Sequence, residues 1–262
     1  MRLLLALALF AASVHAQIIT PSSKPATYPA IQFKNCPYNY VTIYAQPCTF
    51  DKPVTAGDLI IVAALGCNTD LLYWPPYACA LASDEQGDNF QIANMIPQDN
   101  FIPLLYALNA KGGPTTINFM NASARLAMIA EYPPSTGLDD SNWGTYDAQN
   151  PNGDPQGQSS DTGSTRVVVA SQPGELLVAW GLAAQTLIGD GTVENAEYTV
   201  TAGPGFMMRG QLYGGVLAFE DSITTVPGAY FGTILWGGYG HWDLGMAAFK
   251  MVTPLVVKGC VN

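Results

Sequence analysis

The feature that most constrains the fold is a short segment that occurs twice. The first copy is Gly57-Asp58-Leu59-Ile60-Ile61-Val62-Ala63-Ala64, and the second is Gly174-Glu175-Leu176-Leu177-Val178-Ala179-Trp180-Gly181. In each copy a glycine and an acidic residue precede an aliphatic run. This pattern is typical of a strand that begins at a tight turn and is buried on both faces or in a sandwich core.

Further strand-like segments follow each copy in the same order. Four follow the first copy, at 88–93, 104–108, 115–119 and 125–132, and four follow the second, at 197–201, 215–219, 228–234 and 244–249. The sequence therefore predicts an all-β, antiparallel sandwich built from two similar halves, half 1 at about 31–132 and half 2 at about 164–255. The alternative is that any β-sandwich yields short strands at this spacing.

Composition agrees with an all-β chain. Charged residues make up only 11% of the 262 residues, whereas Gly and Pro number 26 and 19. Helix surfaces are normally rich in Lys, Glu and Arg, and turns between strands are rich in Gly and Pro. The net charge is −10 and the basic residues form no cluster. This balance disfavours nucleic acid and anionic membranes as partners.

The first residues have the pattern of a secretory signal peptide, residues 1–16. Arg2 precedes an apolar run at 3–12, and Val14-His15-Ala16 forms a small-residue cleavage site. Residues 17–30 predict a flexible leader, and 31–262 a single domain in which 133–163 form a long loop between the halves. We expect a secreted, extracellular protein without membrane insertion, since no segment reaches the roughly 20 apolar residues of a membrane span. The sequon at Asn121 would then be open to glycosylation.

Five cysteines in a secreted chain predict two disulfides and one further thiol. Cys67 and Cys79 bracket a short segment and are a natural pair, as are Cys36 and Cys48. Cys260 would then be free or would form an intermolecular bond. Pairing of Cys36 with Cys260 is the main alternative, and spacing does not decide between them.

Several of these segments resemble a known class of domains. They are Thr55-Ala56-Gly57-Asp58-Leu59-Ile60-Ile61-Val62, residues 84–90, Ala130-Glu131-Tyr132, and Pro173-Gly174-Glu175-Leu176-Leu177-Val178-Ala179. They are similar to uncharacterised secreted bacterial β-sandwich domains, which occur in large surface or exported proteins. The resemblance covers about residues 31–250 and implies a jelly-roll or concanavalin-like sandwich. It implies no active-site residues, and the cysteines and the loop around Trp74 are additions to its pattern.

No catalytic motif stands out in the sequence. His241 is the only histidine after the predicted cleavage site, which excludes a multi-histidine metal site. A carboxylate pair such as Glu131 and Glu220 could support glycoside hydrolysis, which needs two acids facing each other across a groove. The alternative is that these acids have structural roles at strand ends.

Aromatic residues are the most informative candidates for ligand binding. They are Tyr73, Trp74 and Tyr77, between Cys67 and Cys79, and Trp143 and Tyr146, in the long loop. A rigid, exposed ring can stack on the apolar face of a sugar at small entropic cost. The alternative is that the rings close the open ends of the sandwich, and we expect Trp180 and Trp242, on core-like strands, to be buried.

One acidic turn is a candidate calcium site. Asp84, Glu85 and Asp88 lie close together in the sequence, and Ca²⁺ takes several oxygen ligands from such turns. A solvated acidic turn is the alternative, and no other cofactor is expected.

The sequence as a whole predicts a secreted, non-catalytic module that binds an extracellular glycan or a cell-surface protein. The first alternative is a structural or matrix protein that self-associates at the surface. The second is a glycoside-active enzyme. The sequence identifies no ligand.

Overall fold

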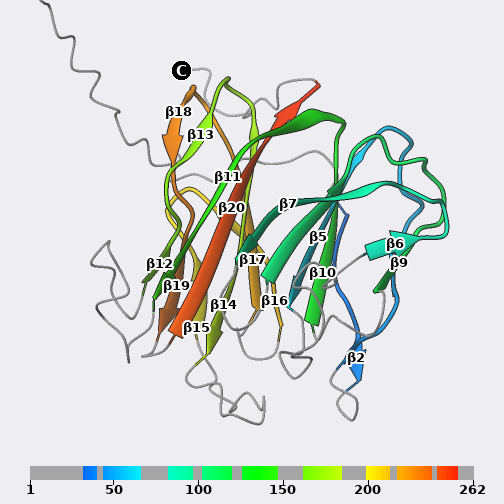
Figure 1. Cartoon of the computed structure of the whole chain (residues 1–262), viewed down its shortest axis with the longest axis horizontal. Helices are drawn as coiled ribbons and strands as arrows, with labels where there is room; N and C mark the ends of the chain where they lie inside the picture. Colours follow the sequence, from blue (N-terminus) through cyan, green and yellow to red (C-terminus); the bar gives the residue numbers. More distant parts are fainter. Residues whose placement is uncertain are drawn as a thin grey trace, which may run out of the picture.

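The computed structural model of the chain describes residues 32–39, 44–65, 82–96, 102–119, 126–146, 162–184, 199–212, 217–237 and 241–252. In these ranges the chain forms β-strands and no helix, and every strand pair is antiparallel (Figure 1). The predicted all-β, antiparallel class is therefore confirmed. The predicted signal peptide and leader lie outside the described residues.

Two five-stranded sheets form the centre of the molecule. The first has the order β1 (Gln32–Asn35), β10 (Leu126–Tyr132), β5 (Leu59–Leu65), β8 (Ile102–Ala107), β7 (Phe90–Ile96). The second has the order β11 (Ser135–Tyr146), β20 (His241–Met251), β14 (Leu176–Ala184), β17 (Leu217–Ile223), β16 (Met207–Leu212). If the five strands of each sheet are numbered in chain order, their spatial order across the sheet is first, fifth, second, fourth, third in both sheets.

Smaller sheets repeat the correspondence. One three-stranded sheet has the order β4 (Cys48–Thr49), β9 (Thr116–Phe119), β6 (Ala82–Asp84), and the other has β12 (Thr162–Ser164), β19 (Thr233–Gly237), β15 (Thr199–Ala202). Two strand pairs complete the set, β2 (Tyr38–Asn39) with β3 (Tyr44–Ala45) and β13 (Val168–Ala170) with β18 (Gly228–Tyr230). An isolated β-bridge joins Val54, just before β5, to Gly113, just before β9. The pair β13-β18 joins the corresponding positions of the second set of strands, just before β14 and just before β19.

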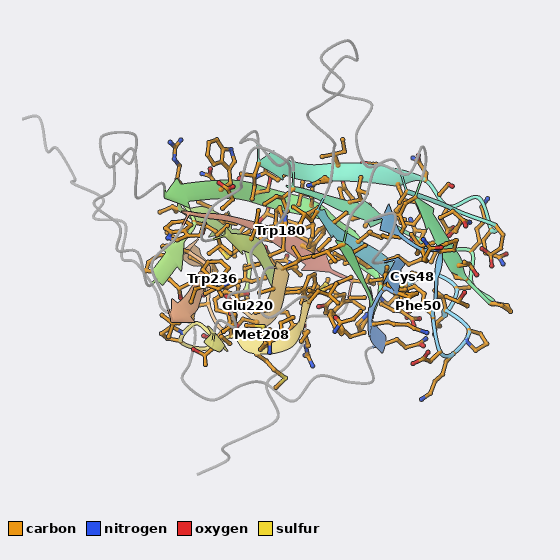
Figure 2. The ribbon with its side chains drawn as sticks, turned by 90° about the horizontal axis from the view of Figure 1, so that it is seen from below. Cys48, Phe50, Trp180, Met208, Glu220 and Trp236 are labelled. Atoms are coloured by element: carbon orange, nitrogen blue, oxygen red, sulfur yellow. A yellow bond between two sulfur atoms is a disulfide. The ribbon has the colours of Figure 1, made fainter. Side chains whose placement is uncertain are left out.

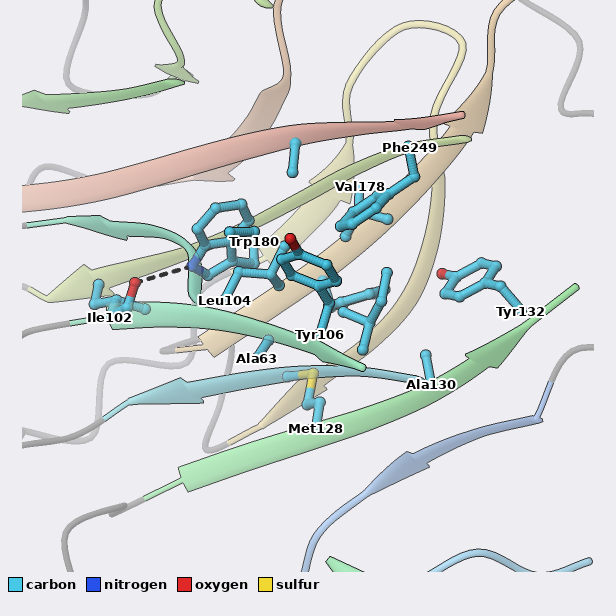
Figure 3. Close-up of a cluster of buried hydrophobic side chains, with 14 of the residues drawn as sticks. Ala63, Ile102, Leu104, Tyr106, Met128, Ala130, Tyr132, Val178, Trp180 and Phe249 are labelled. Carbon is cyan, nitrogen blue, oxygen red and sulfur yellow. Dashed lines mark hydrogen bonds between the residues drawn. The ribbon is translucent and has the colours of Figure 1, made fainter. Parts of the chain in front are cut away.

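Three hydrophobic clusters separate these sheets into layers. The central cluster joins β5, β7, β8 and β10 of the first five-stranded sheet to β14, β17 and β20 of the second (Figure 3). A second cluster lies between the first five-stranded sheet and β4 and β9, and a third lies between the second five-stranded sheet and β13, β18 and β19. Figure 2 shows Cys48 and Phe50 at one end of the molecule, Trp236 toward the other and Trp180 between them.

This layering explains the aliphatic runs of the sequence. All seven residues of β5 are buried, and those of β14 from Leu176 to Leu182 are buried as well. Alternate residues of each strand enter two different clusters, so neither face is free to carry polar side chains. Trp180 and Trp242 are buried as predicted.

The turn before each of these strands has the same backbone geometry. Gly57 and Gly174 have φ angles of 95° and 78°, in the left-handed region that favours glycine. Gly57 N–H donates to the carbonyl of Ala110 at 2.8 Å, and Gly174 N–H donates to the carbonyl of Thr224 at 2.8 Å. The two similar segments therefore each begin at a turn with a glycine in the left-handed region.

The structure differs from the prediction of a long loop over 133–163. Residues Ser135–Tyr146 form β11, the edge strand of the second five-stranded sheet. Its polar side chains bind the backbone of residues 167–171: Asn142 Nδ2 donates to Val167 O, Asp140 Oδ2 accepts from Val169 N, and Asp139 Oδ2 accepts from Ser171 N. The sequence of such an edge strand resembles that of a loop, because its polar side chains bind neighbouring backbone and it has no apolar run.

Candidate functional site

The described structure contains some of the predicted site residues and not others. Tyr73, Trp74 and Tyr77, with Cys67 and Cys79, lie outside the described residues, as do Asn121 and Cys260. Trp143, the acidic turn and the Cys36–Cys48 pair are described. Cys36 and Cys48 form a disulfide, with their Cα atoms 5.2 Å apart, as one of the two alternatives predicted.

Trp143 lies on the edge strand β11, opposite Gly245 of β20. Its side chain is half-buried and packs against the central hydrophobic cluster. The exposed Arg166 places its guanidinium carbon 5.4 Å from the centre of the ring, within the range of a cation–π contact. The indole is therefore held by the core on one side and by a cation on another.

The residues around Trp143 fix its backbone. Trp143 N–H donates to Asn142 Oδ1 at 3.0 Å, and Asn142 Nδ2 donates to Val167 O at 3.1 Å. Val167 is 42% exposed. Asn142, Trp143, Arg166 and Val167 together present an aromatic ring, an amide, a cation and an apolar group, and we call them the Trp143 surface.

Tyr146 is near the end of the same strand. Its backbone pairs with Trp242, while its side chain lies outside the described part of the structure. Trp236 and Trp242, also near the last hairpin, are buried and stack on each other with ring centres 6.4 Å apart. These two rings belong to the core of the second half.

The carboxylates of the acidic turn accept hydrogen bonds from backbone N–H groups, while Asp84 Oδ2 and Asp88 Oδ2 are buried without a hydrogen-bond partner among the described residues. Asp84 Oδ1 accepts from Asp88 N, Asp88 Oδ1 accepts from Lys111 N, and both carboxylate oxygens of Glu85 accept from Thr116 N. Lys111 Nζ donates to the carbonyls of Gln86 and Gly87, at 2.8 Å each. In the described residues no group of three or more acids, histidines or cysteines is arranged to hold a metal, so calcium at this turn stays a prediction.

A pair of carboxyl groups lies at the start of β5. Glu131 Oε1 accepts from Thr55 N at 2.7 Å, and Glu131 Oε2 accepts from Gln32 Nε2 at 2.5 Å. Burial and the adjacent carboxylate of Glu131 raise the pKa of Asp58 to about 7. Asp58 therefore keeps its proton up to a pH near neutrality.

A related corner lies at the start of β14, and it contains a lysine. Glu175 is fully buried, and its Oε1 accepts from Gln172 N at 2.9 Å and from Ser171 Oγ at 3.2 Å. Lys250 Nζ lies 2.5 Å from Asp139 Oδ1. Burial raises the pKa of Glu175, and the neighbouring charge of Asp139 raises it further.

A buried polar network between the two five-stranded sheets was not predicted. Tyr132 of β10 donates its hydroxyl to Asp221 Oδ2 of β17 at 2.6 Å, and Arg209 Nε of β16 donates to the same oxygen at 2.7 Å. A single arginine between Met208 and Gly210 gives no sequence signal of such a network.

Glu131 and Glu220 do not form a pair across a groove. Glu131 lies on the face of β10 whose side chains enter the cluster between the first five-stranded sheet and β4 and β9. Glu220 is fully buried on the face of β17 whose side chains enter the cluster between the second five-stranded sheet and β13, β18 and β19. Gly203 N–H donates to Glu220 Oε2 at 2.9 Å, and burial raises the pKa of Glu220 well above its usual value. The two five-stranded sheets lie between these acids.

Comparison with known proteins gives no relative. No family model, no curated protein and no solved structure matches the chain. Within the described residues no helix is long and apolar enough to cross a membrane. The candidates for function therefore come from the geometry alone.

Proposed function

We propose that this protein is a secreted, non-catalytic β-sandwich module that binds an extracellular glycan through the Trp143 surface. The observation that supports this function is the half-buried indole of Trp143, fixed against the central cluster and contacted by the exposed Arg166. A ring held in this way loses little conformational freedom when a ligand stacks on it.

The chemistry of the Trp143 surface suits a sugar. The indole offers an apolar face for C–H groups, and the guanidinium of Arg166 and the amide of Asn142 offer donors for hydroxyl or carboxylate oxygens. The net charge of −10 repels strongly anionic polymers at long range. The ligand class that fits best is therefore a neutral or weakly acidic polysaccharide.

Two finer features of the fold belong to the same proposal. Each half of the chain is a jelly roll, and the halves arose by duplication. The matching strand orders of the two five-stranded sheets and of the two three-stranded sheets support this origin. Extracellular location is supported by the Cys36–Cys48 disulfide, since disulfides persist mainly in oxidising compartments.

The test is a pull-down of the purified protein on a panel of soluble and insoluble polysaccharides. We expect one class to retain the protein, and we expect Arg166→Ala and Trp143→Ala each to weaken retention at least several-fold. Arg166→Ala removes an exposed side chain, so it tests the surface even if Trp143→Ala disturbs packing. Leu235→Ala is the matched control, because Leu235 is exposed on β19, outside the Trp143 surface.

Two other results would decide against this proposal. Retention that is unchanged in both variants but lost in Trp74→Ala would move the binding site to the predicted Tyr73-Trp74-Tyr77 platform. No retention on any polysaccharide, at concentrations where weak lectins bind, would contradict glycan binding.

A self-associating structural protein is the second candidate. Val167 and Val169 are 42% and 49% exposed, and they lie two residues apart on or beside β13, so they share one face. If this face joins two copies, light scattering after size exclusion will show a dimer that Val169→Lys dissociates.

A further inference from the structure

Three strands bring an amine and two carboxyl groups together at one corner of the second half. Asp139 lies at a bulge of β11, where the register with β20 shifts between Leu138 and Asp140. Lys250 is near the end of β20, and Glu175 directly precedes β14. Since β20 lies between β11 and β14, the side chains come from three adjacent strands.

The corner is closely packed on its carboxyl side. Glu175 is fully buried, the side chain of Asp139 is 11% exposed and that of Lys250 is 37% exposed. Lys250 Nζ lies 2.5 Å from Asp139 Oδ1, while Ser171 N holds the other oxygen of Asp139 at 2.8 Å. The amine is therefore held against one carboxyl group whose orientation is fixed.

Glu175 is placed to exchange a proton with this pair. Ser171 joins the two acids, since its N–H donates to Asp139 Oδ2 and its hydroxyl donates to Glu175 Oε1. Burial raises the pKa of Glu175, so its carboxyl stays protonated to a higher pH than usual. A neutral carboxylic acid beside a second carboxyl group can donate a proton to it and later take one back.

We propose that Lys250 and Asp139 form an intramolecular isopeptide bond, with Glu175 as the acid–base group. In the neutral pair, the Lys250 amine attacks Cγ of protonated Asp139, and a C–N bond forms. Glu175 moves a proton from the nitrogen to the departing oxygen, the C–O bond breaks, and one water molecule leaves. The reaction joins an amine and an acid into an amide, so it needs no oxidant, reductant or co-substrate.

The ion pair between Lys250 and Asp139 limits the rate of this reaction. Burial alone would raise the pKa of Asp139, but its hydrogen bonds with Lys250 and Ser171 hold it below the usual value, and Asp139 raises the pKa of Lys250. The charged form therefore dominates, and the amide forms through the less populated neutral form, slowly and after folding. The corner of Asp58 and Glu131 in the first half differs, because there the pKa of an acid is raised by a second acid beside it.

The bond would join β11 and β20, which are neighbours in the second five-stranded sheet and are its first and last strands in chain order. Cross-links that close long loops restrict the unfolded chain most in the chain-entropy model. An isopeptide bond at this place would also resist the reductants that open Cys36–Cys48.

The decisive measurement is the intact mass of the folded, secreted protein after reduction, together with fragmentation of its peptides. We expect a chain lighter by one water molecule and a branched peptide that joins Lys250 to Asp139. Lys250→Arg keeps the cation and the ion pair but removes the nucleophile, so this variant should have the full mass. Glu175→Gln should remain unjoined for far longer than the parent protein.

The size of the mass loss and the Lys250→Arg variant distinguish the isopeptide bond from other reactions that lower the mass. Cyclisation of an N-terminal glutamine releases ammonia instead of water, and a succinimide at Asp139 would persist in Lys250→Arg. The full mass in the parent protein after prolonged incubation in the folded state, or a linear peptide containing Lys250, would overturn the proposal.

Discussion

Three glycines of the second half lie where a tryptophan ring occupies the space of a side chain. A Cβ at Gly163 would meet Trp236, and one at Gly181 would meet the same ring and the backbone of Asp243. A Cβ at Gly245 would meet Trp180, which is directly opposite on β14. Rings that cover cross-strand glycines fix the register of the sheet.

We predict that Gly245→Ala destabilises the protein by about 1–3 kcal/mol, because the added methyl group overlaps the Trp180 ring. The measurement is urea unfolding of both proteins. In a Trp180→Leu background the same change should cost much less, since the ring is gone. An equal cost in both backgrounds would show that the overlap with Trp180 is not the cause.

Asp58 gives a prediction for pH. Its pKa is raised from 3.8 to about 7 by burial and by Glu131, so the folded state keeps a proton that the unfolded state has released. Unfolding then releases a proton over this window, and stability falls as pH rises from about 4 to about 7. Asp58→Asn should remove this contribution to the loss of stability with rising pH.

The check is the free energy of unfolding at pH 5 and pH 8 for the parent protein and Asp58→Asn. The variant should gain stability relative to the parent at pH 8. Asp51→Asn is a suitable control, because Asp51 is an exposed acid paired with Lys34. Parallel pH profiles for the parent protein and Asp58→Asn would contradict the raised pKa of Asp58.

At the scale of single residues, the sequence predicts burial better than it predicts contacts. Trp180 could be placed in the core because it continues an aliphatic strand. Trp236 could not, since it stands at the end of a short apolar run before two glycines, and its ring fills the space left by Gly163 and Gly181. The contact between Trp143 and Arg166 joins residues that are far apart in the sequence, so local pattern carries no information about it.

At the scale of elements, the strands that are buried on both faces could be predicted, and so could the edge strand β7, which overlaps the predicted segment 88–93. The edge strands β1 and β11 could not. β5, β10, β14 and β20 have aliphatic runs. β11 is polar because its side chains cap the backbone of the next segment, and β1 is only four residues long. Edge strands of this kind lack the signal that burial creates.

The disulfide connects two elements of the first half. Cys36 follows β1 at the edge of the five-stranded sheet, and Cys48 begins β4 of the three-stranded sheet. We predict that Cys36→Ala with Cys48→Ala lowers the free energy of unfolding by about 2–4 kcal/mol. Urea unfolding with and without reductant measures it, and reductant should destabilise the parent protein far more than the double variant.

At the scale of the whole molecule, the central cluster is shared between the two halves. Trp180 Nε1 of the second half donates to Ile102 O of the first at 3.1 Å, as Figure 3 shows. The rings of Tyr106 and Phe249 also meet across the sheets, with centres 5.3 Å apart. The repeated segments of the sequence indicated two related units, but they could not show that the five-stranded sheets face each other.

We predict that neither half is a stable monomer when it is produced alone, because each would expose the face of its five-stranded sheet that forms the central cluster. Residues 17–133 and 134–262 produced together should co-purify as one complex. Phe249→Asp in the second fragment should prevent co-purification, since a charge in the cluster would lack a partner. Val226→Asp is the control, because Val226 is exposed. Two separate, monomeric and folded halves would show that the central cluster is a contact between independent domains instead of a common core.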